Sequence, residues 1–478
     1  MRTNARLGDS DASVFVSERA SETTGFRRRE NGRQETEFKI QNGAKNEASK
    51  TGSLCGASDG FWGGVKNRVF GNFAKSGLKS QILAVLAACW AVCACGQNGS
   101  DWNVFRGPNG GVSPWTNAPV AWDGASGQNV LWKMPLKMTG VSSPVLQGKR
   151  LYLTEGDEKE RAVLAFDAGN GRLLWRRIVA DGGQGTPLPP VSDYGLAMPT
   201  AACDTNGVYA LFGTGDLAAF APDGRPMWSL YLGRPIMGYG FASSPCVISN
   251  LVCVQFDHHA GGRMLAVETT TGKIKWDVSR SRGASWSSLM VVPDADGKPI
   301  VIANANGSTT GYDLAGRVVW DVDGATGEVA PSPVWCNGCV IVVNIGSKML
   351  CQNVHGNVAK KWEYTGYLSD SASPVVVNGL LFMATSDGHL TCLDAITGAE
   401  LWQHECPGSY ASLLASGDRV YVMGRDGDTL IVKAARTYQA VGQCRLSDST
   451  DATPAMTDGR FYIRGGKWLW CMGKAGQP

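Results

Sequence analysis

Two short motifs contain residue types that bind metals or carry out redox chemistry. Cys336 and Cys339 form a C-x-x-C motif, a spacing found in redox-active and zinc-binding sites. A zinc site needs three or four converging ligands, and no second C-x-x-C occurs in the chain. His258 and His259 are adjacent, and neighbouring side chains on an extended chain point in opposite directions. Neither motif therefore predicts a metal centre.

The cysteines are better interpreted as structural residues. The Asn-Gly pair between Cys336 and Cys339 is a signal for a two-residue hairpin turn, which would place the two thiols opposite each other. An oxidising compartment could join such a pair in a disulfide. Cys246 and Cys253 could pair across strands in the same way. The sequence leaves the oxidation state of both pairs open.

The chain lacks the signatures of common enzymes and of nucleic-acid-binding proteins. Residues 101–478 contain no G-x-S-x-G, H-E-x-x-H or G-x-x-x-x-G-K-[ST] sequence. Its formal net charge is +3 over 478 residues, and no cluster of lysine and arginine is interleaved with aromatic residues. We therefore expect a protein that is not an enzyme and does not bind nucleic acid.

Regularly spaced tryptophans predict the elements that position these residues. Seven tryptophans from Trp132 to Trp402 follow one another at intervals of 40 to 53 residues, a period typical of one repeated supersecondary unit. In the clearest copy, from Thr391 to Trp402, an acidic residue lies eight positions and a glycine four positions before the tryptophan. These tryptophans are Trp132, Trp175, Trp228, Trp276, Trp320, Trp362 and Trp402.

A second landmark opens each repeat. A serine or threonine, usually beside a proline, precedes an apolar run, a turn and a second apolar run. Each repeat therefore contains four strands, and residues 128–472 show no helical periodicity. Four-stranded sheets at this spacing are typical of β-propeller blades. The openings begin at Ser143, Pro199, Ser244, Ser288, Ser332, Ser373, Ser412 and Thr453.

The ends of the array predict how the ring closes. From Thr453 onwards the chain supplies only three strands, whereas Val130–Lys133 is a strand with a tryptophan but no opening. We expect this N-terminal strand to complete the last blade, which removes exposed sheet edges. The predicted fold is all-β: an eight-bladed propeller of four-stranded antiparallel blades over residues 128–478. Residues 101–127 precede it and are called the lead-in segment below.

The tryptophan segments resemble those of the quinoprotein-type, or PQQ-like, β-propeller family. The opening Phe105-Arg106-Gly107-Pro108-Asn109-Gly110-Gly111 is similar to that of bacterial PQQ-like repeat proteins, many of them named for similarity to the outer-membrane assembly lipoprotein BamB. The resemblance implies that each tryptophan docks against the neighbouring blade. WD-repeat propellers have a similar period, but their usual Gly-His partner is missing here.

The seventh repeat departs from the pattern. Cys444 stands where the docking tryptophan should be, and the residues from Val432 to Gly442 lack the usual spacing of the acidic residue and the glycine. We expect this blade to be more loosely packed than the others.

The resemblance leaves three functions open. Enzymes of the family hold PQQ and calcium on the propeller axis, often under a disulfide between adjacent cysteines, but this chain has no Cys-Cys pair and is shorter. We therefore expect no PQQ, no metal and no catalytic residue. The preferred function is a monomeric, non-catalytic scaffold that binds another envelope protein or peptide. The alternatives are a PQQ-dependent oxidoreductase and a carbohydrate- or small-ligand-binding propeller, which aromatic residues converging on the central funnel would favour.

In such a propeller, one face carries the loops between blades and the loops between second and third strands, and it is the usual binding surface. Trp286 with Arg280 and Arg282 is either a recognition patch or a packed residue beside two solvated charges. The candidates on this face are Asp257, His258, His259, Arg280, Arg282, Trp286, Asp387, His389, Arg425 and Asp426.

The N-terminal region differs in composition from the propeller. Residues 1–74 are polar and charged, and we interpret them as a disordered leader or as a misassigned translation start. Residues 75–95 contain an uncharged apolar run after a basic patch, which predicts a signal peptide or signal anchor. Cys95, followed by Gly96, resembles a lipoprotein processing site. We expect a protein of the periplasm or outer membrane, tethered to the membrane if Cys95 is lipidated.

Overall fold

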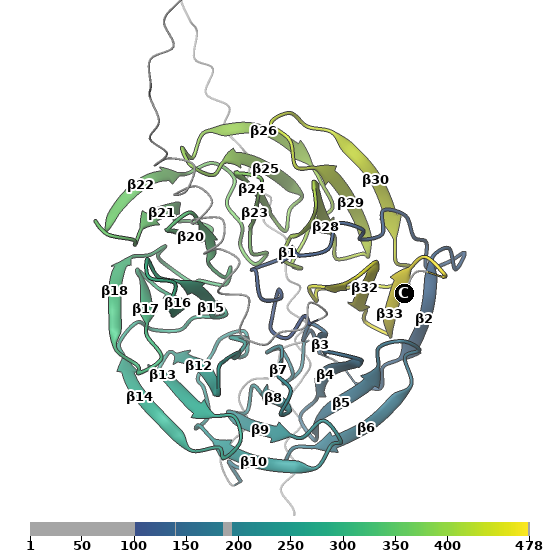
Figure 1. Cartoon of the computed structure of the whole chain (residues 1–478), viewed down its shortest axis with the longest axis vertical. Coiled ribbons are helices and arrows are strands. Elements are labelled where there is room, and N and C mark those ends of the chain that lie inside the picture. The colour runs from purple at the N-terminus through teal and green to yellow at the C-terminus, as the bar shows by residue number, and fades with distance from the viewer. Residues whose placement is uncertain (1–100, 139, 185–193, 477–478) are drawn as a thin grey trace, which may run out of the picture. The chain divides into compact units, whose positions relative to one another are not determined.

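The computed structural model describes residues 101–138, 140–184 and 194–476. The predicted leader, signal segment and lipidated Cys95 lie outside these residues, and no helix within them could cross a membrane. The described chain forms eight antiparallel sheets around a central axis (Figure 1). The predicted eight-bladed propeller is therefore confirmed.

Blades 1 to 4 each consist of four consecutive strands, numbered from the axis outwards. Blade 1 contains β3 (Val145–Gln147), β4 (Arg150–Gly156), β5 (Arg161–Asp167) and β6 (Leu173–Ile178). Blade 2 contains β7 (Ala202–Cys203), β8 (Val208–Leu211), β9 (Asp216–Phe220) and β10 (Pro226–Tyr231). Blade 3 contains β11 (Cys246–Ile248), β12 (Leu251–His258), β13 (Gly261–Glu268) and β14 (Ile274–Arg280). Blade 4 contains β15 (Met290–Pro293), β16 (Pro299–Ala305), β17 (Ser308–Tyr312) and β18 (Val318–Asp323).

Blades 5 to 8 continue the ring. Blade 5 contains β19 (Val334–Cys336), β20 (Cys339–Val343), β21 (Met349–Asn353) and β22 (Ala359–Tyr364). Blade 6 contains β23 (Val375–Val377), β24 (Leu380–Ala384), β25 (His389–Asp394) and β26 (Glu400–Glu405). Blade 7 contains β27 (Leu414–Ser416), β28 (Arg419–Met423), β29 (Asp428–Lys433) and β30 (Ala440–Arg445), and blade 8 contains β31 (Ala455–Thr457), β32 (Arg460–Arg464), β33 (Trp468–Gly473) and β2 (Val130–Pro135).

The ring closes through the N-terminal strand, as predicted. Strand β2 pairs antiparallel with β33, and Trp132 lies opposite Cys471. One strand was not predicted: β1 (Val112–Ser113) from the lead-in segment adds to blade 7 by pairing parallel with the innermost strand β27.

The tryptophans hold neighbouring blades together at the outer edge of the propeller. The indole N–H of Trp175 donates to the carbonyl of Pro222 in the next blade at 3.0 Å, and Trp228 donates to Thr269 at 2.8 Å. Four further junctions have the same bond, from Trp132 to Ala168, Trp276 to Leu314, Trp362 to Ala395 and Trp402 to Ala435. These contacts form a girdle in which each ring packs on the turn between the third and fourth strands of the following blade.

The repeated glycine and the repeated acidic residue both belong to that turn. Gly272 has a φ of +73°, and a Cβ added to it would lie 2.7 Å from the ring of Trp228. Only glycine fits, because the turn needs a left-handed residue and the ring leaves no room. The carboxylate of Asp394 accepts the backbone N–H groups of Ile396 and Thr397, each at 3.1 Å, which holds the same turn in blade 6.

The junction of blades 7 and 8 lacks the docking tryptophan of the repeat and contains Trp122 of the lead-in segment instead. Cys444 is buried in one hydrophobic cluster with Phe461 of blade 8 and Trp122 of the lead-in segment. The Trp122 ring lies 5.5 Å from that of Phe461, and its backbone carbonyl accepts the N–H of Arg445. The lead-in segment thus supplies an aromatic ring to the junction where the repeat has lost its own, which the expectation of loose packing did not foresee.

Candidate binding funnel

The hydroxyl residues that open the blades form a ring around the propeller axis. The backbone N–H of each residue donates to the side-chain hydroxyl of the next, as from Ser288 to Ser332 at 3.0 Å and from Ser412 to Thr453 at 2.8 Å. Seven links of this kind run from Ser143 to Thr453. The Oγ of Ser143 has no hydrogen-bond partner among the described residues. Blades 1 to 8 are therefore linked in succession at the axis, and most junctions are also held at the outer edge, whereas no such hydroxyl link joins blade 8 to blade 1 among the described residues.

The lead-in segment passes through the centre of this ring (Figure 1). Trp102 pairs with Leu146 of blade 1, and the guanidinium of Arg106 donates to the carbonyls of Pro333 and Pro374 in blades 5 and 6. Arg106 is buried, and this burial lowers its pKa to about 9. The segment therefore contacts blades on opposite sides of the axis, and its Phe105 lines the cavity described next.

The result is a funnel with a cavity of about 710 Å³, within the range of about 300–1,000 Å³ of ligand pockets. All eight hydroxyl residues of the ring line its wall. Further lining residues come from the loops between blades and between second and third strands, as expected for the binding face. The aromatic lining residues are Phe105, Tyr194, Tyr239, Trp286 and Tyr410, and the acidic ones are Glu328, Asp370 and Asp451.

Arg425, one of the sequence candidates, lies beside the cavity in contact with three lining residues. Its guanidinium pairs with Asp451 at 2.9 Å, lies 4.0 Å from the ring centre of Tyr410 and donates to the hydroxyl of Tyr194 at 3.2 Å. The hydrogen bond to Asp451 raises the pKa of Arg425. The charge of Arg425 is thus held by a carboxylate and an aromatic face.

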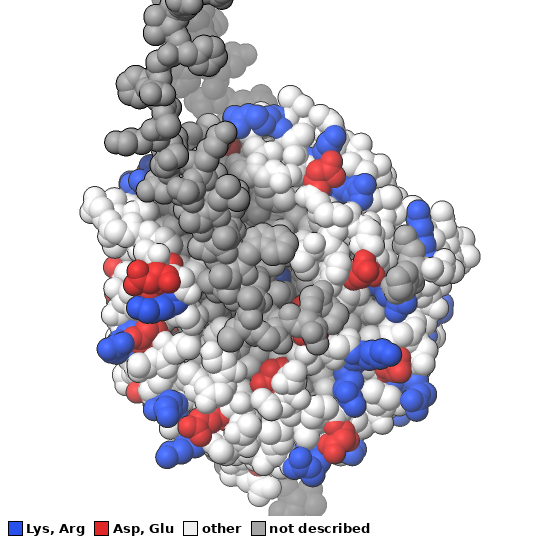
Figure 2. Space-filling model, viewed as in Figure 1, with Lys and Arg blue, Asp and Glu red and all other residues white. Residues whose placement is uncertain are grey.

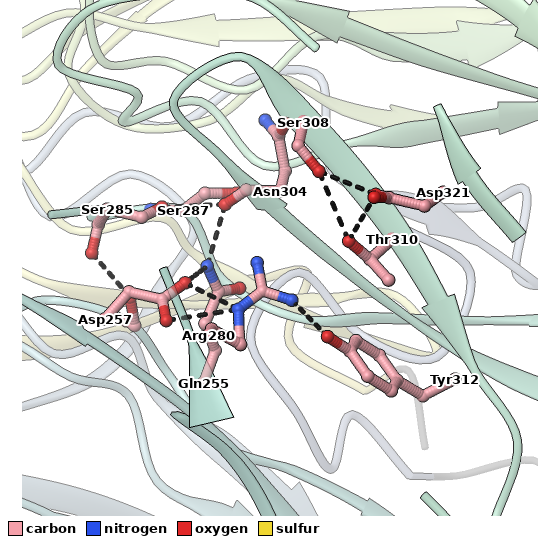
Figure 3. Close-up of polar contacts among 11 residues, drawn as sticks. Gln255, Asp257, Arg280, Ser285, Ser287, Asn304, Ser308, Thr310, Tyr312 and Asp321 are labelled. Atoms are coloured by element: carbon pink, nitrogen blue, oxygen red, sulfur yellow. Dashed lines mark hydrogen bonds and ion pairs between the residues drawn. The ribbon is translucent and has the colours of Figure 1, made fainter. Parts of the chain in front are cut away.

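Asp257 and Arg280 are not on the exposed surface where the sequence placed them. They form a buried ion pair at 3.1 Å between β12 and β14 of blade 3, and the Arg280 guanidinium also donates to the hydroxyl of Tyr312 in blade 4 at 2.6 Å (Figure 3). Burial raises the pKa of Asp257, and the positive charge of Arg280 opposes that shift. The ion pair has almost no solvent exposure, so a partner has no access to it, and the bond from Arg280 to Tyr312 joins blade 3 to blade 4.

Trp286 is also separated from the charges that the sequence placed beside it. Its side chain lines the cavity but is 9% exposed, and its indole N–H donates to the carbonyl of Gly240 at 2.8 Å. Arg282 faces Asp321 of blade 4 instead. Of the two interpretations, the structure agrees with a packed rim residue, although Arg280 is buried rather than solvated.

The histidines occupy different surroundings. His258 lies edge-on to the ring of Phe256, and partial burial lowers its pKa. His259 approaches the ring of Trp286 at 6.3 Å. The two side chains therefore make separate contacts, which agrees with the expected divergence. Within the described residues, no group of three or more His, Cys, Asp or Glu is arranged to hold a metal.

The remaining candidates lie at the tips of blades 6 and 7. His389 stacks on Tyr367 with ring centres 3.9 Å apart, and its Nδ1 lies 3.2 Å from the Asp387 carboxylate. Hydrogen bonds from Thr385 and from His389 lower the pKa of Asp387. Asp426 is exposed beside Arg425. None of these three candidates lines the cavity, but Asp387 and Asp426 lie in second-to-third-strand loops of the same face and His389 begins the third strand of blade 6.

Most funnel-lining residues were missed by the sequence reasoning. Tyr239, Glu328 and Tyr410 lie in loops between blades that share no common pattern, so the repeat alignment does not single them out. The hydroxyl ring was visible as the openings of the repeats, but it was used only to count strands. Its position next to the axis could have identified the loops immediately before each opening as the funnel wall.

The cysteine pairs lie where the hairpins predicted. Cys336 is directly opposite Cys339, across a turn in which Asn337 and Gly338 both have positive φ, and Cys246 is directly opposite Cys253. All four are thiols here. The hydrogen bond with Cys246 and burial raise the pKa of Cys253 well above its usual range. The disulfide question therefore stays a prediction.

The charges on the face shown in Figure 2 are mixed. Lysine and arginine side chains alternate with aspartate and glutamate around the periphery, and neither sign covers a large area. Such a surface has no electrostatic footprint for a polyanion such as nucleic acid.

Comparison with known proteins identifies the family. The model of the outer membrane protein assembly factor BamB family matches residues 115–254, 195–404 and 368–469. A curated relative, outer membrane protein assembly factor BamB of Yersinia pestis, is 25% identical over 290 residues, which are 59% of this chain and 68% of the relative.

Two solved structures share the fold at low sequence identity. BamB from Moraxella catarrhalis superposes with a TM-score of 0.53 at 12% identity, covering 72% of this chain and 97% of that one. Quinohemoprotein alcohol dehydrogenase from Comamonas testosteroni superposes with a TM-score of 0.56 at 14% identity, covering 83% and 85%. These likenesses show the propeller fold alone, whereas the family match extends over most of the described chain. The chain belongs to the BamB family of PQQ-like repeat propellers.

Proposed function

We propose that this protein is a non-catalytic, extracytoplasmic scaffold that binds another envelope protein or peptide on its funnel face. Its family is named for outer-membrane protein assembly, which supports an envelope location and a role in assembly. One structural observation carries the proposal: large apolar side chains are exposed around the funnel mouth. They are Ile236, Tyr239, Ile345 and Tyr367, between 44% and 63% exposed.

Exposed apolar residues gathered on one face of a rigid protein are typical of protein interfaces. The loops that carry them are firmly held. Trp286 donates its backbone N–H to the carbonyl of Val329, and His259 donates its own to the carbonyl of Ile236. Because the blades fix these loops before a partner arrives, little conformational entropy is lost on binding.

Site-specific photo-cross-linking in cells tests this proposal. A benzophenone amino acid at Tyr239 or Ile345 is expected to form covalent adducts with an envelope protein. Ile396 is the matched control, because it is 57% exposed and lies in the turn between the third and fourth strands, on the opposite face. Adducts of equal yield at Ile396, or adducts only there, would contradict docking on the funnel face.

A second candidate function is the binding of a carbohydrate or another small ligand. The observation that favours it is the convergence of five aromatic side chains on the cavity, together with the hydroxyl ring. Aromatic faces and hydrogen-bonding groups are common in sites for polar ligands. Titration with neutral oligosaccharides, followed by tryptophan fluorescence and calorimetry, tests it, and saturable binding that Tyr239→Ser weakens would support it over the scaffold.

The funnel chemistry argues against PQQ as a resident cofactor. PQQ is a polycarboxylate anion, whereas the described residues that line the cavity include three acidic ones and no lysine or arginine. The cofactor would meet charge repulsion where it needs cations. The residues present therefore do not fit PQQ. A PQQ absorption spectrum in purified protein, or a raised melting temperature after addition of PQQ and Ca²⁺, would contradict this assignment.

A further inference from the structure

We infer that the funnel receives a positively charged side chain, lysine or arginine, carried on an extended segment of the partner. The inference rests on the proposed function, because it specifies the chemistry of the protein that docks there. Its basis is a group of three hydrogen-bond acceptors that line the cavity, which we call the acceptor cluster. Asn344 lies between β20 and β21 of blade 5, and Glu328 and Asp370 lie in the loops before and after that blade.

Asn344 is the central member of the acceptor cluster. Its side chain is 1% exposed and lines the cavity, and its amide nitrogen donates to the carbonyl of Thr326 at 2.6 Å. That bond fixes the orientation of the amide, because the nitrogen cannot exchange places with the oxygen without losing it. The Oδ1 atom then has no partner among the described residues. A buried acceptor without a donor is unfavourable, so the site calls for a ligand that donates.

The carboxylates of Glu328 and Asp370 indicate that the hydrogen-bond donor is also positively charged. Glu328 is exposed and Asp370 is half-buried, and both line the same cavity as Asn344. Asp370 accepts the backbone N–H of Ser386 at 3.2 Å, which leaves its negative charge without a cationic partner among the described residues. Since none of the lining residues within 101–138, 140–184 and 194–476 is a lysine or arginine, we assign the cation to the partner.

The loop that carries Glu328 is held rigidly beside an aromatic wall. The N–H of Gly327 donates to the Asn306 side chain at 2.9 Å, and the carbonyl of Val329 accepts the N–H of Trp286 at 2.9 Å. Tyr239 packs on Trp286 with ring centres 5.8 Å apart. A cation that binds the carboxylate would therefore lie close to aromatic faces, which also attract cations. Lysine and arginine fit both features, because their apolar stems pack on rings while their charged ends bind acceptors.

Binding of a matched pair of peptides tests the inference. The probe is a capped pentapeptide with the sequence serine–phenylalanine–arginine–phenylalanine–serine. Its control has citrulline, a neutral analogue of the same shape, in place of arginine. We expect the arginine peptide to bind the whole protein about tenfold or more tightly in calorimetry at low salt, because charge-assisted hydrogen bonds are the stronger ones. Equal affinities of the two peptides, or no binding of either, would overturn the inference.

A double variant locates the effect. Glu328→Gln with Asp370→Asn should remove the preference for arginine over citrulline while leaving citrulline binding unchanged. The matched control is Asp296→Asn with Asp418→Asn, which makes the same change in net charge in the exposed first-to-second-strand turns of the opposite face. Thermal unfolding checks that all variants are folded. If the control pair lowers the preference as much as the funnel pair, non-specific attraction explains it and the inference fails.

The outcome can be separated from that of the proposed function. If cross-linking places a partner on the funnel face but both peptides bind alike, the scaffold function stands and the cation-binding role is wrong. If a neutral oligosaccharide binds in the funnel and displaces the arginine peptide, a small-ligand site replaces the inference.

Discussion

At the outer edge of the propeller, a tryptophan meets the same turn of the next blade at junction after junction. At the axis, the ring of hydroxyl residues is equally regular, but the loops above it differ from blade to blade. The girdle of tryptophans and the hydroxyl ring are therefore structural, because the same contacts recur at most blade junctions. The funnel wall is free to vary, since each lining loop belongs to one blade only. Contacts that repeat from blade to blade stabilise the fold, whereas the candidate site is formed by loops that differ between blades.

Removal of a girdle ring should have the largest effect on stability. Trp175→Ala deletes a ring that is 8% exposed, packs against Phe220 and donates to Pro222. We expect a loss of about 3–5 kcal/mol in the free energy of unfolding, measured by urea denaturation. Cys444→Ala, at the equivalent position of blade 7, should cost only about 1 kcal/mol, because that junction relies on Trp122 instead. Similar losses for both variants would contradict the distinction between regular and irregular junctions.

A glycine substitution separates ring contact from backbone strain. Gly272 and Gly356 occupy equivalent turns with φ of +73° and +71°, but an added Cβ meets Trp228 only at Gly272 and open space at Gly356. Gly272→Ala should therefore cost about 2–4 kcal/mol and Gly356→Ala about 1–2 kcal/mol. Chemical denaturation of both variants measures the difference. Equal costs would mean that the Trp228 ring moves aside freely.

The hydroxyl ring can be broken at one link. Ser332→Ala leaves the buried N–H of Ser288 without an acceptor and should destabilise the protein by about 1–2 kcal/mol. Ser143→Ala is the control, because the Ser143 Oγ accepts no ring bond, and its effect should stay within about 0.5 kcal/mol. Differential scanning fluorimetry of the two variants tests the order. A larger loss for Ser143→Ala would show that the Ser143 hydroxyl makes a stabilising contact, which contradicts its lack of a partner among the described residues.

Replacement of Asp394, which accepts backbone N–H groups in the turn between the third and fourth strands of blade 6, should have a small, pH-dependent effect on stability. The hydrogen bond with Arg436, followed by the backbone N–H of Thr397, lowers the pKa of Asp394 to about 2. Because the folded pKa lies below the unfolded value of about 4, the stabilisation is present above pH 4 and is lost as the pH falls towards 2. Asp394→Asn should therefore destabilise the protein by at most about 1 kcal/mol at pH 7, and the gap between variant and wild type should shrink as the pH approaches 2. A gap that is constant with pH would contradict this.

Substitutions at the funnel mouth should affect stability least. Tyr239→Ser and Ile345→Ser change exposed side chains and should alter the free energy of unfolding by no more than about 0.5 kcal/mol. Under the proposed function, the same variants reduce photo-cross-linking from neighbouring positions of the face. A variant that unfolds the protein would show that the funnel mouth is structural after all.

The sequence by itself determined the repeating architecture. The tryptophan period, the glycine and acid before each tryptophan and the orphan strand at Val130–Lys133 were sufficient for eight blades and for their closure. The physical reason is that these features recur, because the same contact between neighbouring blades has to be made at nearly every junction.

Only the tertiary structure decided what lies at the centre. No local pattern indicated that Asp257 and Arg280 would form a buried pair that contacts Tyr312 of the next blade, that Trp122 would fill the junction beside Cys444, or that Phe105 would line the funnel. Each of these contacts occurs once and is not part of the repeat. Contacts that occur only once leave no periodic pattern in a sequence, so the residues of the site could be identified only from the tertiary structure.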